Sequence, residues 1–421
     1  MSPGPRLLSV LGLVLTAISS AFGELTWSSD TPITLSGPHS GHQLVLLGTA
    51  RDLTRDATFT SAPEGIVTID SSGYVRPLRN GTTTVTATWE NGSASPRTIT
   101  VERHGDTIPV SFVNEIVPLF TRHGCNGGSC HGKVGGQNGF RLSLMGFEPH
   151  RDRNYVREGL GRRIFRAAPG HSLLVMKGAG LLPHKGGTRV EKGSDDYQLL
   201  IRWISEMGSS PENDTGDPGV DRIAVMPADR LTAAGASQQL RVTAYFKDGT
   251  TSDVTRAAVY ESNDESMAKT DLKGLVHLKD KAGTASVMVR FREHVAVFRA
   301  TVPLGAPLET TPSPRNLVDE HVFAKLQTLG LPPSDRCDDG TFLRRVTVDI
   351  AGRLPSLQEA RSFIEDQSPD KRSRVIDTLL ESSDYADYFA GKWASILRNQ
   401  RRNDKHRPET YAFHEWIRQS L

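Results

Sequence analysis

Two cysteines and a histidine lie close together near the first third of the chain, in the segment from Cys125 to His131. Cys125 and Cys130 are separated by four residues, and His131 follows the second cysteine directly. Attachment of a c-type haem needs two thiols for the haem vinyl groups and an imidazole that reaches the iron. The spacing therefore predicts Cys125 and Cys130 as the thioether residues and His131 as the proximal iron ligand.

The usual c-type motif has two residues between its cysteines, so this spacer is longer than expected. Gly127 and Gly128 accept positive φ and allow a longer loop, and the two added residues cost well under about 1 kcal/mol of closure entropy. Other chemistry stays open. The alternatives are a local Cys125–Cys130 disulfide, a zinc site completed by His123 or His184, and a redox-active dithiol, which lacks a surrounding βαβ pattern.

The elements that would position this motif form a helical block at residues 107–208. The side chains of Phe112, Ile116, Leu119 and Phe120 would share one helix face. Ser194 is predicted to cap a second amphipathic helix. A helix, a cysteine loop, an irregular middle and a final helix together outline a small haem domain.

Two turn-rich segments with alternating apolar residues flank this block, at residues 32–102 and 221–303. Asp52-Leu53-Thr54-Arg55 in the first is matched by Asp253-Val254-Thr255-Arg256 in the second. Each match is followed by an alternating run, a glycine turn and a Gly-Thr step. Such an internal repeat predicts two copies of one β-sandwich.

Residues 317–421 are expected to form an all-helical domain. Ser356 and Glu359 have the spacing of a capping box. The last amphipathic helix continues to Leu421 without a stop signal, so we expect the natural chain to extend further and this domain to be truncated.

The composition of the 421-residue chain is that of a globular protein, and its net charge of +2 argues against a nucleic-acid surface. Residues 1–23 indicate a signal peptide: Arg6 precedes an apolar stretch, and Ala21-Phe22-Gly23 forms a cleavage pattern. The mature protein is therefore expected to be soluble, without a transmembrane segment, and located in the periplasm or at the cell surface.

The central block resembles the planctomycete-type cytochrome c-like domain, through the motif from Cys125 to His131 and the run from Asn138 to Leu144. Residues 317–421 are similar to the helical domain of unknown function that follows such cytochromes, and both flanking repeats resemble the bacterial immunoglobulin-like domain of group 2. In related cytochromes the distal iron ligand lies in the loop before the last helix. The resemblance thus implies His184 as the distal ligand, with Met176 as the alternative. A bis-histidine iron would have a lower potential than a His/Met pair.

The sequence as a whole predicts a multidomain α+β fold: two Ig-like β-sandwiches flanking an α-helical cytochrome c-like domain, followed by an all-α C-terminal domain. The predicted function is one-electron transfer by an exported protein carrying covalent haem c, an electron carrier more than an enzyme, with an unknown redox partner. The Ig-like domains would act as spacers or contact a surface protein or polysaccharide. The alternative is a structural or adhesive cell-surface protein with a Cys125–Cys130 disulfide and no haem.

Overall fold

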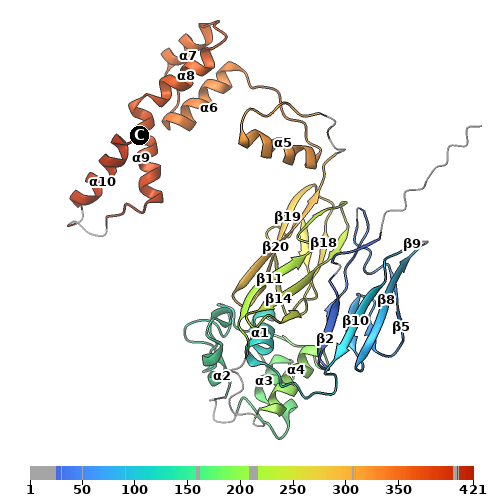
Figure 1. Cartoon of the computed structure of the whole chain (residues 1–421). Helices are drawn as coiled ribbons and strands as arrows, with labels where there is room; N and C mark the ends of the chain where they lie inside the picture. The colour runs from blue at the N-terminus through green and yellow to red at the C-terminus, as the bar shows by residue number, and fades with distance from the viewer. Residues whose placement is uncertain are drawn as a thin grey trace, which may run out of the picture. The chain divides into compact units, whose positions relative to one another are not determined.

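A computed structural model describes residues 25–29, 31–49, 51–90, 92–157, 162–207, 217–305, 308, 310–401, 405 and 407–421. The predicted signal peptide lies outside these residues. The chain divides into two compact units, Met1–Leu331 and Pro332–Leu421 (Figure 1). The first unit holds two β-sandwiches and a helical segment between them in sequence, and the second is helical.

The first β-sandwich, named repeat 1, runs from Thr26 to Glu102. Its strands are β1 (Thr26–Trp27), β2 (Ile33–Ser36), β3 (His42–Gln43), β4 (Leu46–Leu47), β5 (Thr58–Ala62), β6 (Val67–Ile69), β7 (Tyr74–Pro77), β8 (Gly81–Trp89), β9 (Gly92–Ser93) and β10 (Arg97–Glu102). They form sheets of order β2-β10-β8-β5, with β9 on β8, β3-β7-β6 and β1-β4. In β8, Val85 and Ala87 are fully buried while Thr84, Thr86 and Thr88 are not, as the alternating pattern predicts.

The second β-sandwich, repeat 2, runs from Val220 to Val302. Its strands are β11 (Val220–Met226), β12 (Asp229–Leu231), β13 (Ser237–Gln239), β14 (Arg241–Phe246), β15 (Thr251–Asp253), β16 (Val259–Ser262), β17 (Ala268–Thr270), β18 (Leu275–Leu278), β19 (Gly283–Phe291) and β20 (His294–Val302). The orders β12-β20-β19-β16 and β13-β18-β17 match the two main sheets of repeat 1, and β11-β14-β15 extends the two-stranded sheet β1-β4 by one strand. In both repeats the last strand pairs in parallel with the second. The sequence repeat is therefore also a structural repeat.

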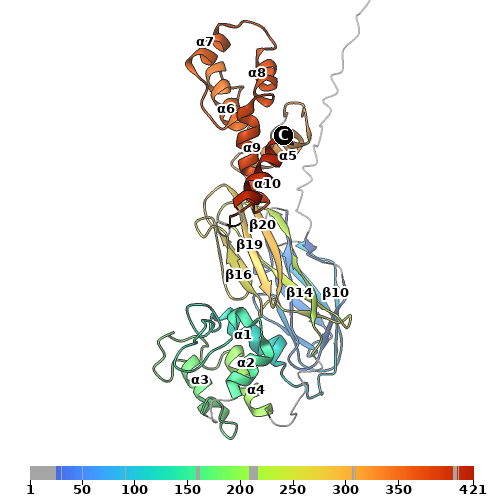
Figure 2. The same cartoon turned by 90° about the vertical axis from the view of Figure 1, so that its left-hand side faces the viewer.

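The helical segment lies between the repeats in sequence and beside them in space (Figures 1 and 2). It comprises η1 (Phe112–Ile116), α1 (Val117–Arg122), η2 (Leu144–Gly146), α2 (Pro149–Arg157), η3 (Pro169–His171), α3 (Leu173–Gly178) and α4 (Asp195–Glu206). Phe112, Ile116, Leu119 and Phe120 are buried in one core with Leu200 and Ile204. The Ser194 hydroxyl accepts a hydrogen bond from Tyr197 N, which confirms the predicted cap.

The remaining helices complete the two units. They are α5 (Leu317–Leu329), α6 (Asp339–Ala351), α7 (Leu357–Glu365), α8 (Lys371–Leu380), α9 (Ser383–Ile396) and α10 (Arg407–Gln419). Helix α5 belongs to the first unit, where Lys325 Nζ donates to Thr284 Oγ1 at 2.7 Å. The capping box of Ser356 and Glu359 is formed at the start of α7. The mixed α+β fold with an all-helical C-terminal region is thus confirmed, whereas nothing in the described helices identifies the middle segment as a cytochrome c fold.

Candidate functional site

The Cys-His segment forms a tightly hydrogen-bonded loop after α1. Cys125 N donates to Phe120 O at 2.8 Å, and His131 N donates to Cys125 O at 3.0 Å. Asn126 is 1% exposed, and its amide donates to Thr121 Oγ1. A Cβ at Gly132 would lie 2.0 Å from Asn126 O, so the loop requires a glycine there. Backbone hydrogen bonds and the close approach at Gly132 therefore define the shape of the loop.

The thiols of this loop are free, as is Cys337. Cys125 packs against the core of the helical segment. Burial, with a smaller contribution from the neighbouring Cys130, raises the pKa of the Cys125 thiol to about 12. Cys125 is therefore protonated and a poor nucleophile near neutral pH.

The structure places the His184 ring beside the His131 ring. The two imidazole rings are 6.3 Å apart between centroids and tilted by 5°. His131 Nδ1 is 2.9 Å from Phe140 O, and His184 Nδ1 is 2.9 Å from Gly187 O. Burial lowers the pKa of His131, so its ring is neutral near pH 7. Met176 lies in α3 and makes backbone hydrogen bonds within that turn.

The predicted metal chemistry has to be corrected. The described part of the chain contains no group of three or more His, Cys, Asp and Glu side chains that could hold a metal ion. Cys125 packs against the core, and one ring nitrogen of each imidazole lies within hydrogen-bonding distance of a loop carbonyl. The expected description as a metal-binding protein is therefore wrong, and the expected haem-binding and electron-transfer roles find no support in these residues. No contact tests the individual assignments of Cys125, Cys130, His131, His184 and Met176 or covalent haem c, which stay predictions from sequence.

A second candidate site lies where repeat 1 meets repeat 2, and it is built by the repeated Asp-x-Thr-Arg motif. Asp253 Oδ2 accepts from Gln43 N at 2.8 Å, across 210 residues of sequence. Asp52 Oδ2 accepts from Gln239 N at 2.5 Å and from Gln238 Nε2 at 2.7 Å. Each aspartate thus caps a backbone N–H of the other repeat. We name this pair of contacts the reciprocal clamp.

The threonine and the arginine of each motif support the clamp from the two sides. Thr54 Oγ1 and Thr255 Oγ1 accept from a backbone N–H of their own repeat, at 2.9 and 2.8 Å. Arg55 Nη2 donates to Gln239 Oε1 at 3.0 Å. Arg256 Nη2 donates to Asp70 Oδ2 at 3.0 Å. The two threonines therefore bind within their own repeat, and the two arginines bind the opposite one.

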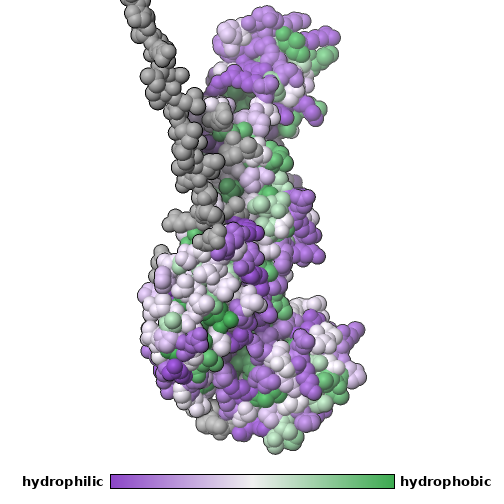
Figure 3. Space-filling view, turned by 90° about the vertical axis from the view of Figure 1, so that its right-hand side faces the viewer, coloured by the Kyte–Doolittle hydropathy of each residue, from purple (hydrophilic) through white to green (hydrophobic). Residues whose placement is uncertain are grey.

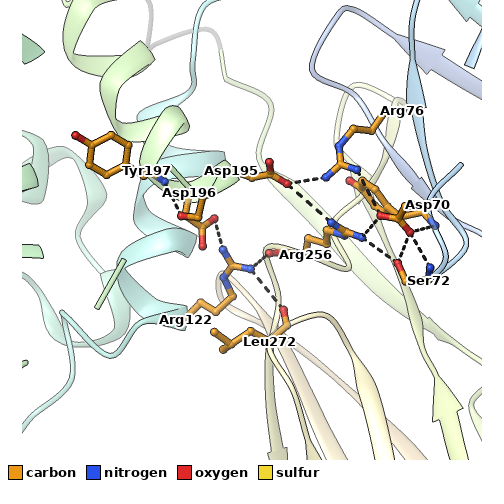
Figure 4. A network of polar contacts seen from close by, with 11 residues as sticks. Asp70, Ser72, Arg76, Arg122, Asp195, Asp196, Tyr197, Arg256 and Leu272 are labelled. Atoms are coloured by element: carbon orange, nitrogen blue, oxygen red, sulfur yellow. Dashed lines mark hydrogen bonds and ion pairs between the residues drawn. The ribbon is translucent and has the colours of Figure 1, made fainter. Parts of the chain in front are cut away.

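The helical segment joins this junction through acidic residues at the start of α4 (Figure 4). Arg122 at the end of α1 donates to Asp196 and to Arg256 O. Asp195 Oδ2 accepts from Arg76 Nη2 at 2.6 Å and lies 3.9 Å from Arg256 Nη1. These charged contacts tie both repeats to the helical segment.

Hydrogen bonds and nearby charges lower the pKa of Asp70 and Asp196 at the junction, whereas burial raises the pKa of Asp52. Burial would raise the pKa of Asp70, but hydrogen bonds from Ser72 and Tyr74 N and the charge of Arg256 lower it to about 2. Burial would also raise the pKa of Asp196, but the hydrogen bond from His123 and the charge of Arg122 together outweigh it. Both aspartates are ionised at neutral pH.

Sequence reasoning treated the Asp-x-Thr-Arg motif only as a marker of repetition and missed its role. The available signal was that three polar residues recur at fixed spacing among otherwise diverged residues. A buried aspartate needs donors, and Asp52 and Asp253 find theirs in the other copy. The first unit therefore belongs to a class of architecture in which polar contacts hold two β-sandwich repeats together.

Comparisons with known proteins match part of the chain. A family model described as a protein of unknown function, DUF1549 (PSCyt2), matches residues 317–421. The search of curated proteins finds no match.

Solved structures are similar to the chain at a low level. Domains 1–6 of the surface layer protein SbsC are 12% identical with a TM-score of 0.19, covering 69% of this chain and 28% of that one. Domains 5–6 of SbsC are 10% identical with a TM-score of 0.26, covering 67% and 98%. The adhesin InvE of Yersinia pseudotuberculosis is 11% identical with a TM-score of 0.15, covering 67% and 59%. The chain thus spans little more than a quarter of the first of these, and scores this low support no conclusion about function.

Proposed function

We propose that this chain is an exported structural protein of the cell surface, in which the two repeats and the helical segment form one stiff support. The observation that carries the proposal is the reciprocal clamp, because it fixes two sandwiches that lie about two hundred residues apart in sequence. A chain that only tethered its domains would need no buried polar contacts between them.

The signal-like segment in the sequence supports export, and the structure adds two observations on helices and surface. The signal-like segment at residues 1–23 precedes the described residues. Among the described helices, none is both long and apolar enough to cross a membrane. On the face shown in Figure 3, apolar residues are scattered among polar ones.

Cell fractionation tests the proposal. We expect the protein in intact cells to react with a membrane-impermeant amine label and to lack its first 23 residues by mass spectrometry. A Leu13→Arg variant is the matched control, because a charge in the apolar stretch should block export and leave the chain unlabelled. Recovery of the unaltered, unlabelled protein in the cytoplasmic fraction would contradict the proposal.

A further inference from the structure

A hollow of about 590 Å³ opens beside the reciprocal clamp, at the place where repeat 1, repeat 2 and the helical segment meet. Its size falls in the range of small-molecule sites. The lining residues come from all three parts of the unit: Arg55, Arg122, Val259, Tyr260, Thr270, Asp271, Leu272, Lys273 and Leu275. Three of these side chains are cations, and one is a carboxylate.

The turn that borders this hollow has a counterpart in repeat 1. Asp271 Oδ1 accepts from Lys273 N at 2.7 Å and Leu275 N at 2.9 Å. In repeat 1, the Asp70 carboxylate accepts from the backbone N–H groups two and four residues further on, at 2.9 and 3.1 Å. The two turns are therefore equivalent, and the residue that matches Ser72 in repeat 1 is Lys273 in repeat 2.

At the turn of repeat 1, a carboxylate from the helical segment occupies the space beside the arginines. Asp195 contacts Arg76 and approaches Arg256, while Arg256 binds Asp70 (Figure 4). Two cations thus face two carboxylates. The charge at this turn is balanced within the protein.

At the turn of repeat 2, no carboxylate of the described residues pairs with the neighbouring cations as Asp195 does in repeat 1. Arg55 binds an uncharged amide oxygen of Gln239, and the Lys273 ammonium has no hydrogen-bond or ion-pair partner among the side chains that the structure describes. Arg122, whose side chain is 7% exposed, already pairs with Asp196. Positive charge is therefore left unbalanced around a solvent-accessible hollow.

We propose that this hollow binds a small organic carboxylate of about the size of a sugar acid, with its carboxylate between Arg55 and Lys273. The ligand would supply the negative charge that Asp195 supplies at the equivalent turn of repeat 1. Charge-assisted hydrogen bonds to an arginine fork and an ammonium are the interactions that recognise a carboxylate. The inference stands independently of the structural role proposed above.

Calorimetric titration of the full chain with glucuronate tests the site, with glucose as the uncharged probe of matched ring size and inorganic phosphate as the second anion. We expect glucuronate to bind, and glucose and phosphate to bind at least about tenfold more weakly, because only the first offers a planar carboxylate to Arg55. Lys273→Ala should weaken glucuronate binding about tenfold, and Lys273→Glu should abolish it because the new carboxylate neutralises Arg55.

Lys279→Ala is the matched control, since Lys279 is an exposed lysine of the same repeat outside the hollow. Circular dichroism of each variant separates loss of binding from loss of fold. Absence of glucuronate binding to the folded protein, equal binding of phosphate, or unchanged affinity in folded Lys273→Ala would each overturn the proposal.

Discussion

Asp52 and Asp253 are carboxylates that each accept hydrogen bonds from both repeats at the junction. Each one accepts an N–H from the threonine of its own motif and an N–H from the other repeat. A buried charge without donors would cost several kcal/mol, and the opposite repeat that covers each aspartate also supplies a donor to it. The same two residues therefore stabilise both the turn and the interface.

Asp70 makes the junction sensitive to acid. Its pKa is about 2 in the folded protein against an ordinary value of 3.8. Because the folded-state pKa is lowered, its contribution is complete above about pH 4 and is lost as the pH falls toward 2. Asp70 is partly exposed, and solvent screening limits the effect to about 1 kcal/mol.

An Asp70→Asn variant should accordingly be less stable than the wild type by about 1 kcal/mol at pH 6 and equally stable near pH 2. Urea unfolding at several pH values measures this difference. Asp221→Asn, the same change at an exposed position of β11, should leave stability unchanged at every pH. If the stability difference between Asp70→Asn and the wild type were the same at every pH, Asp70 would not have the lowered pKa described above.

Among the elements, the Cys-His loop depends on its glycines more than on its cysteines. Gly132→Ala would bring a methyl group to 2.0 Å from Asn126 O. We expect a loss of about 1–3 kcal/mol in the unfolding free energy, which is the usual cost of overpacking, together with faster hydrogen exchange of residues 125–132.

Gly135→Ala is the control for this change, because a Cβ at Gly135 meets nothing within 4 Å. Thermal unfolding followed by circular dichroism compares the two variants. If Gly132→Ala were as stable as Gly135→Ala, the close approach of Asn126 O would not restrict position 132 to glycine.

Local features of the elements could be predicted from the sequence, because their causes are local. The alternation of Val85 and Ala87 follows from strand geometry, and the caps at Ser194 and Ser356 depend on hydrogen bonds to neighbouring residues. The site could not be predicted in this way. The adjacency of Cys130 and His131 in sequence does not determine the direction of the Cys125 side chain. The hydrogen-bond partner of Asp52 lies 187 residues away in sequence, so no local pattern indicates it.

At the scale of the whole molecule, the reciprocal clamp should make the two repeats unfold together. We expect the Asp52→Asn and Asp253→Asn variants each to lose about 2–4 kcal/mol of stability, because one amide replaces an acceptor of several N–H groups. In the wild type the repeats should exchange amide hydrogens in one cooperative event.

Hydrogen-exchange mass spectrometry assigns the exchange to peptides of each repeat. In either clamp variant the repeats should open separately, whereas Asp280→Asn, an exposed change in repeat 2, should keep the single event. Independent opening of the repeats in the wild-type protein would show that the clamp does not couple them.

The distance in sequence between the two halves of the clamp also governs how the chain acquires its structure. Gln43 is synthesised 210 residues before Asp253, and the helical segment must be completed in between. Contacts of such long sequence separation slow folding, and they expose incomplete intermediates. Repeat 1 should therefore stay partly ordered until repeat 2 has been synthesised. Such a delay favours transport of the chain before it folds. The partly ordered chain would need protection from aggregation during that interval.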